Sequence, residues 1–199
     1  MKTAFKLLVL SFFLMAFQCD DEDELIYNNF KISVTPQATF SLQDTIWIEG
    51  KISSKIYNAD TNDSIPYINP PIQEVFYVMK LIDSNLNANS EGALEQFGII
   101  NNLGESFPWR CDKSDLRIES VLNSQGDSYS FKIGFVPLQK ADYVFSFTEG
   151  KLTNPERNEN IAQDYLLSSR PDAIGFERCG EYSYRILNET DREFYFSVR

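Results

Sequence analysis

The sequence predicts an all-β protein whose body is a single antiparallel β-sandwich of about eight strands, with one or two short helices. Three observations favour this class. Aromatic residues make up 14% of the chain, mostly as 16 Phe and 10 Tyr, and such rings pack well on a half-buried pleated surface. Apolar and polar residues alternate with period two in many segments, which is typical of strands. Polar turns with Asn and Gly separate these segments, as in sandwiches and barrels.

Eight segments carry the strand pattern. They are 30–34, 46–52, 74–82, 116–122, 129–135, 143–147, 182–186 and 194–198. In 129–135, for example, Phe131 and Ile133 alternate with Ser130 and Lys132. The segment 74–82 is apolar on both faces, which predicts a central strand.

Two further segments predict short helices. Ser90–Phe97 begins with Ser, a helix-capping residue, and Gly98 follows its end, as at many helix termini. Asn158–Leu167 has Ile161 and Tyr165 four residues apart, so their side chains would share one helix face.

Residues 1–18, MKTAFKLLVLSFFLMAFQ, have the pattern of a secretory signal peptide. Lys2 and Lys6 form a basic start, and an apolar stretch runs from Leu7 to Phe17. The stretch is shorter than the roughly 20 apolar residues of a spanning helix. It is apolar on all sides and ends at a block of acids, so a signal peptide is favoured over a buried helix.

Cys19 follows the apolar stretch directly, with Ala16 three positions before it, and this arrangement resembles the lipobox of bacterial lipoproteins. The resemblance implies that Cys19 receives a diacylglycerol, that cleavage occurs before it and that membrane lipid is thereby a partner. The acidic run after it resembles the export signal of Bacteroidota-type surface lipoproteins. The run consists of Asp20, Asp21, Glu22, Asp23 and Glu24. The alternative is a solvated spacer on a protein that faces the periplasm.

These patterns predict a signal peptide over 1–18, a lipidated Cys with an acidic flexible spacer over 19–27, and a β-sandwich over 28–199. Immunoglobulin-like sandwiches are common among lipoproteins of this kind, so the resemblance implies that architecture for the body. The resemblance of the acidic run to an export signal implies a place at the outer membrane, exposed at the cell surface.

Charge and the absence of histidine exclude several functions. The chain has 29 acidic and 18 basic residues and a net charge of -11, so phosphate backbones repel it and we expect no nucleic-acid partner. It has no His, which removes the usual general base and the commonest transition-metal ligand. We therefore assign no catalytic residue, metal or cofactor.

Cys111 and Cys179 remain once Cys19 is lipidated. Two cysteines in an oxidising compartment predict a disulfide, and the alternative is a pair of buried free thiols. Trp109 stands close to Cys111 in the sequence, so we expect it to pack near the disulfide.

Two further features have competing interpretations. Alternation places Trp47 on the polar face of 46–52, where it would contact a sugar or a partner, but packing under a loop or between the sheets is the favoured reading. Asp60, Asn62, Asp63 and Ser64 are oxygen-bearing residues close in sequence. A calcium loop of the EF-hand kind would need Gly at Ile65 and Glu at Pro71, so a polar turn is favoured.

The first functional hypothesis is a non-catalytic, lipid-anchored module that binds a glycan, an envelope protein or a host molecule. The second is a carboxylate-dependent hydrolase that acts on extracellular polymer, because acidic residues are plentiful and two carboxylates suffice for glycoside hydrolysis. The third is a structural subunit of an envelope assembly that docks by strand addition at a sheet edge.

Overall fold

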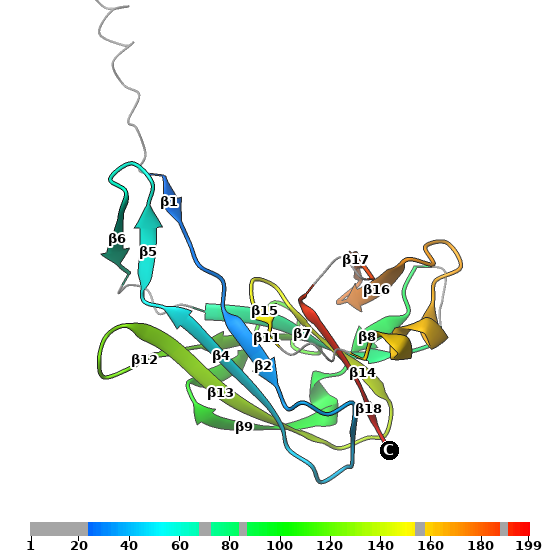
Figure 1. Cartoon of the computed structure of the whole chain (residues 1–199). Helices are drawn as coiled ribbons and strands as arrows, with labels where there is room; N and C mark the ends of the chain where they lie inside the picture. Colours follow the sequence, from blue (N-terminus) through cyan, green and yellow to red (C-terminus); the bar gives the residue numbers. More distant parts are fainter. Residues whose placement is uncertain (1–23, 68–72, 84–86, 154–157, 188–190) are drawn as a thin grey trace, which may run out of the picture. The chain divides into compact units, whose positions relative to one another are not determined.

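A computed structural model describes residues 24–67, 73–83, 87–153, 158–187 and 191–199. It confirms the all-β class (Figure 1), with two 3-10 helices beside the strands. The predicted signal peptide, Cys19 and the acids Asp20 to Asp23 lie outside the described residues. Within those residues, no helix has the length and apolar character needed to cross a membrane.

The chain divides into two compact units. The smaller unit holds the described residues up to Tyr27 together with Ile56–Ile65, and the larger unit holds Asn28–Lys55 and Pro66–Arg199.

The smaller unit is built on a three-stranded sheet in the order β1-β5-β6. Its strands are β1 (Leu25–Ile26), β5 (Lys55–Asn58) and β6 (Asp63–Pro66). The Asn58 side-chain oxygen accepts the backbone N–H groups of Asp60, at 3.0 Å, and Thr61, at 3.1 Å. The Asp60 carboxylate accepts the backbone N–H of Glu24 at 2.8 Å. Residues 59–62 thus form a polar turn, whereas Asp63 and Ser64, which the sequence placed in the same turn, begin β6. Strand β1 occupies part of the range interpreted as spacer.

The larger unit contains a six-stranded sheet in the order β12-β13-β4-β2-β15, with β9 also paired to β13. Its strands are β2 (Lys31–Val34), β4 (Ile46–Ser53), β9 (Phe97–Leu103), β12 (Val121–Leu122), β13 (Ser128–Pro137) and β15 (Lys151–Leu152). The predicted alternation in β4 is confirmed, because Ile46, Ile48 and Ile52 are buried and Glu49 and Lys51 are exposed.

The second sheet of the larger unit has nine strands in the order β17-β16-β8-β7-β14-β18-β3, with β10 and β11 attached through β7. Its strands are β3 (Thr39–Phe40), β7 (Gln73–Leu81), β8 (Ser90–Gly92), β10 (Glu105–Pro108), β11 (Asp115–Glu119), β14 (Asp142–Phe147), β16 (Ala173–Arg178), β17 (Glu181–Ile186) and β18 (Glu193–Val198). The prediction of a central strand over 74–82 is confirmed, because β7 pairs with β14, β8 and β11.

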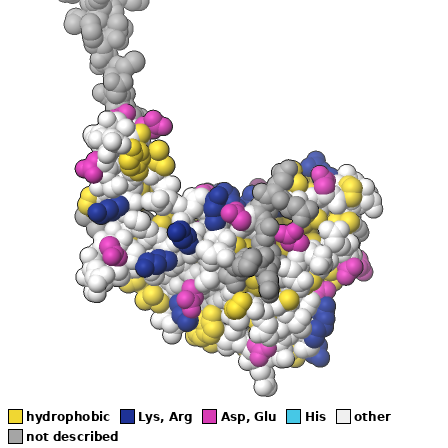
Figure 2. Space-filling model, viewed as in Figure 1, with side chains coloured by type: hydrophobic (Ala, Val, Ile, Leu, Met, Phe, Trp, Pro, Cys, Tyr) yellow, Lys and Arg dark blue, Asp and Glu magenta, His cyan; other side chains and the backbone are white. Residues whose placement is uncertain are grey.

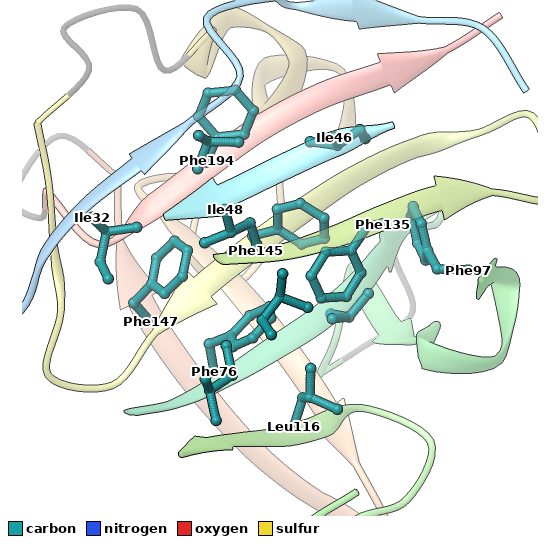
Figure 3. Close-up of a cluster of buried hydrophobic side chains, with 14 of the residues drawn as sticks. Ile32, Ile46, Ile48, Phe76, Phe97, Leu116, Phe135, Phe145, Phe147 and Phe194 are labelled. Atoms are coloured by element: carbon teal, nitrogen blue, oxygen red, sulfur yellow. The ribbon is translucent and has the colours of Figure 1, made fainter. Parts of the chain in front are cut away.

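An aromatic core joins the two larger sheets (Figure 3). The Phe76 ring of β7 lies 5.6 Å from the Phe135 ring of β13, measured between centroids. It also lies 5.9 Å from Phe145 and 5.2 Å from Phe147. Because Phe135 belongs to the six-stranded sheet and the other three to the nine-stranded sheet, these contacts fix one sheet against the other.

The nine-stranded sheet is covered on its other face as well. A second apolar cluster lies there with residues from η2 (Glu159–Tyr165) packed against it. Its members are Met79, Leu81, Val144, Ala162, Ile174, Phe176, Leu187 and Tyr195. This cover explains why every residue of β18 is buried, although the sequence predicts one buried face.

A single antiparallel sandwich of about eight strands is therefore too simple a description. The described residues form three sheets, and three of the strand pairs are parallel: β15 with β2, β16 with β8, and β18 with β3. Each of the eight predicted segments overlaps a strand, and 116–122 is divided into β11 and β12. The predicted helix over Ser90–Phe97 is instead β8 followed by η1 (Leu94–Gln96), and Asn158–Leu167 contains η2.

Candidate functional site

The predicted disulfide between Cys111 and Cys179 is present, with the two Cα atoms 5.9 Å apart. Cys179 and Gly180 form the two-residue turn between β16 and β17, and both have positive φ, 50° and 86°. A two-residue hairpin of the primed type requires positive φ at both turn positions, and Gly180 supplies it without strain. Cys111 lies between β10 and β11, so the disulfide ties this connection to the tip of the β16–β17 hairpin.

A cavity of about 440 Å³ opens beside the disulfide. The side chains that give it chemical character come from β7, β11, the β16–β17 hairpin and the segment before Cys111. They are Tyr77, Trp109, Arg110, Asp115, Arg178 and Glu181. We call this site the disulfide cavity.

Strand register brings the aromatic and cationic residues together on one face of the nine-stranded sheet. Asp115 of β11 pairs with Tyr77 of β7, and Arg117 pairs with Phe107 of β10. The Arg178 guanidinium lies 4.0 Å from the centroid of the Tyr77 ring. The Arg117 guanidinium lies 4.5 Å from the Trp109 ring. Stacking of this kind fixes a guanidinium plane and leaves its edge free to donate hydrogen bonds.

Asp115 and Arg178 form the charged floor of the disulfide cavity. The Arg178 Nη1 atom lies 3.3 Å from one Asp115 carboxylate oxygen and 3.4 Å from the other. Asp115 also accepts the Ser114 hydroxyl at 2.8 Å. The Arg178 Nε atom is buried without a hydrogen-bond partner among the described residues. The Arg178 side chain as a whole is 19% exposed, so part of it reaches the cavity while Tyr77 and Asp115 hold it.

Trp109 supplies the apolar surface of the cavity. It is 40% exposed, and its backbone N–H donates to the Asp115 carbonyl at 2.8 Å. It lines the disulfide cavity together with both cysteines, which agrees with the expectation that it lies near the disulfide.

A second, smaller cavity of about 320 Å³ lies against the same disulfide. Glu91, Glu95, Lys113 and Glu177 line it, and Arg178 is shared with the disulfide cavity. No cluster of three or more metal-ligating side chains is found among the described residues.

Trp47 lies elsewhere, half-buried on the outer face of the six-stranded sheet. A Cβ atom at Gly134 would come within 2.9 Å of the indole, so the ring lies against the bare backbone of β13. The Lys132 ammonium is 5.1 Å from the ring centroid and also pairs with Glu49 at 2.6 Å. Trp47 therefore lies on the polar face of β4, as the alternation predicts, and not between the sheets. Packing under a loop and a role as a ligand contact both stay predictions.

Glu74 of β7 is a carboxylate whose pKa is strongly shifted. Burial raises its pKa from 4.5 to about 7, against the lowering effect of backbone hydrogen bonds. Its Oε1 atom accepts the backbone N–H groups of Thr148, at 3.0 Å, and Glu149, at 3.2 Å. A raised carboxylate pKa is a sign of catalysis when the group faces a cleft. Glu74 has no exposed surface, so its role is structural.

The sequence signals Trp109 and the two cysteines but not Tyr77, Asp115 or Arg178. Arg178 directly precedes Cys179 and Trp109 lies two positions before Cys111, so a disulfide necessarily brings that arginine near that tryptophan. The nearness of Arg178 and Trp109 to the two cysteines is thus a signal that the sequence alone contains. The place of Tyr77 depends on the register between β7 and β11, which the sequence does not specify.

Comparison with family models, curated proteins and solved structures finds no match for this chain.

Proposed function

We propose that this chain is a lipoprotein of the bacterial outer membrane, anchored through Cys19 and exposed at the cell surface, whose all-β body binds a ligand without catalysis. The basic and apolar pattern of 1–18, the position of Cys19 and the acidic run over 20–24 support the anchor. The disulfide between Cys111 and Cys179 is in keeping with an oxidising compartment outside the cytoplasm.

The observation that carries the binding role is the disulfide cavity. It combines an exposed aromatic ring, Trp109, with the fixed polar groups of Arg178 and Asp115. Small-molecule sites are commonly built in this way, with apolar walls and a few oriented polar groups. The chain has no His, and Glu74, whose pKa is raised by burial to about 7, is sealed in the core, so binding is favoured over hydrolysis.

The anchor is tested by protease treatment of intact cells that express the wild type or Cys19→Ala. We expect the wild type to sediment with membranes and to be digested, and Cys19→Ala to be released or to remain unprocessed. The physical reason is that each buried CH₂ of an acyl chain contributes about 0.8 kcal/mol, and two or more chains hold stably. A processed Cys19→Ala, cleaved to the length of the wild type, that still sediments with membranes as the wild type does would show that the anchor is wrong.

A variant with Asn or Gln at 20–24 serves as the matched control for surface exposure. It keeps Cys19 and should stay attached to the membrane, but we expect it to be protected from protease until the outer membrane is broken. If the wild type is itself protected in intact cells, the protein faces the periplasm and the acidic run is a spacer.

A second candidate function, a subunit of an envelope assembly, is favoured by the edge of the six-stranded sheet. In the described part of the chain β9 pairs only with β13. Its residues Ile99, Ile100 and Leu103 are exposed, and Phe97–Leu103 contains no charged residue. Natural edge strands usually carry charge or proline that blocks further pairing, so a bare edge of this kind suits the addition of a partner strand.

Ile100→Lys is expected to remove any assembly that forms at this edge, because a charged side chain on an edge strand opposes strand addition. The measurement is chemical crosslinking of whole cells, followed by detection of high-mass adducts of this chain. Leu138→Lys, at a position that is also exposed, is the matched control and should leave the adducts unchanged. Adducts that persist in Ile100→Lys would eliminate β9 as the interface.

A further inference from the structure

We propose that the disulfide cavity is a site for a neutral sugar, in which a pyranose ring stacks on Trp109 and its hydroxyls bind Arg178, held in place by Asp115, and Glu181. This inference rests on the proposed function as a binding module and names the ligand class that the cavity takes.

The stacking surface is fixed before a ligand arrives. Arg117 lies 4.5 Å from the Trp109 ring, and the Trp109 backbone is bonded to Asp115. The indole is nevertheless 40% exposed and lines the cavity. A large, rigid apolar ring offers contact area at low entropic cost. The C–H face of a pyranose is flat and apolar and fits such a ring.

Hydroxyl groups both donate and accept hydrogen bonds, and the cavity presents both kinds of partner. Arg178 offers N–H groups from a plane held on Tyr77 at 4.0 Å. Glu181 lines the cavity and is exposed, so its carboxylate oxygens can accept. Asp115, which is 4% exposed at its side chain, bonds Arg178 and Ser114 and holds the guanidinium in place. Planar side chains held in one orientation lose little freedom on binding, which favours selective recognition of neighbouring hydroxyls.

The charges of the cavity favour a neutral ligand. Arg110 and Arg178 are matched by Asp115 and Glu181, so the lining has no net charge. An anionic ligand would meet two carboxylates on a chain of net charge -11, and a cationic ligand would meet two guanidinium groups. The volume of about 440 Å³ falls among small-molecule sites, which span roughly 300–1,000 Å³.

The test uses the full lipoprotein, purified in a detergent without a sugar headgroup, on an array of neutral, uronate-bearing and sulfated oligosaccharides. We expect saturable binding to neutral members. Calorimetric titration of the best neutral oligosaccharide should show an affinity about 10-fold or more lower for Trp109→Ala. Trp109→Phe keeps a ring and should retain most of the affinity. Tyr57→Ala removes an exposed aromatic residue of the smaller unit and should match the wild type.

The fluorescence of Trp109 can also show whether the oligosaccharide contacts its indole ring. The chain has two Trp residues, so in a Trp47→Phe background Trp109 is the sole indole fluorophore, and its emission should shift saturably with the same oligosaccharide. The affinity should change by less than about twofold between about 0.05 M and about 0.5 M NaCl, because no net charge is neutralised.

Three results would overturn the proposal: no binding to any array member, an unchanged affinity in a folded Trp109→Ala, or salt-sensitive binding to sulfated or uronate-bearing members alone. Failure here leaves the protease result on intact cells unaffected, so the sugar site and the surface anchor are tested separately.

Discussion

Removal of the disulfide through the double variant Cys111→Ala, Cys179→Ala is expected to lower the free energy of unfolding by about 4 kcal/mol. The two cysteines are 68 positions apart, so the crosslink closes a long loop in the unfolded chain and removes much of its conformational freedom. In the folded state the same bond holds the β16–β17 hairpin, whose strand pairing with the rest of the nine-stranded sheet runs through the short strand β8. The measurement is the denaturant midpoint of equilibrium unfolding.

The control for this variant is chemical reduction. Wild type treated with a thiol reductant should unfold at the midpoint of the double variant, and the double variant should not respond to the reductant. Coincident unfolding curves for oxidised and reduced wild type would contradict the prediction and would show that the bond does not constrain the unfolded chain.

Glu74→Gln is expected to stabilise the protein by about 3 kcal/mol above pH 7 and to change little below pH 4.5. The folded-state pKa of Glu74 is raised by burial from 4.5 to about 7. The folded protein therefore binds the proton of Glu74 more tightly than the unfolded chain does. The contribution of Glu74 to the free energy of unfolding is fully present below pH 4.5 and is lost as the pH rises to 7. Glutamine keeps a side-chain oxygen for the Thr148 N–H without a charge to bury.

Denaturant unfolding of both proteins across this pH range is the measurement. Glu105→Gln, at an exposed position on β10, should follow the wild-type profile. Parallel profiles for Glu74→Gln and wild type would show that Glu74 does not carry the pH dependence. A loss of stability at low pH in Glu74→Gln would instead point to a broken hydrogen bond at Thr148.

The fold class follows from the sequence, but the sheet organisation does not. Alternation identifies strands with one buried face, such as β4 and β13, because the pattern survives wherever the other face meets solvent. It misses β16, where Ala173, Ile174, Gly175 and Phe176 are all buried, because the second apolar cluster covers the outer face. It also misses β9, in which five consecutive residues are exposed at the sheet edge.

The candidate site is predictable in part. Two cysteines and Trp109 are visible in the sequence, and the disulfide that they predict is confirmed. The ring of Tyr77 and the carboxylate of Asp115 reach the same cavity through the pairing of β7 with β11, and register between distant strands is not encoded in a local pattern. Trp47 illustrates the converse, since the pattern places it correctly on the polar face but cannot foresee that Gly134 lets the indole pack against the backbone of β13.

Because Cys179 lies at the hairpin tip, formation of its disulfide determines when the cavity can bind a ligand. Arg178 is its immediate neighbour in the chain, so the bond to Cys111 sets the position of a guanidinium that belongs to the cavity. A newly made chain in a reducing cytoplasm lacks this tether. If the protein is exported as proposed, oxidation outside the cytoplasm acts as a maturation step that delays ligand capture until the protein has reached the place where it works.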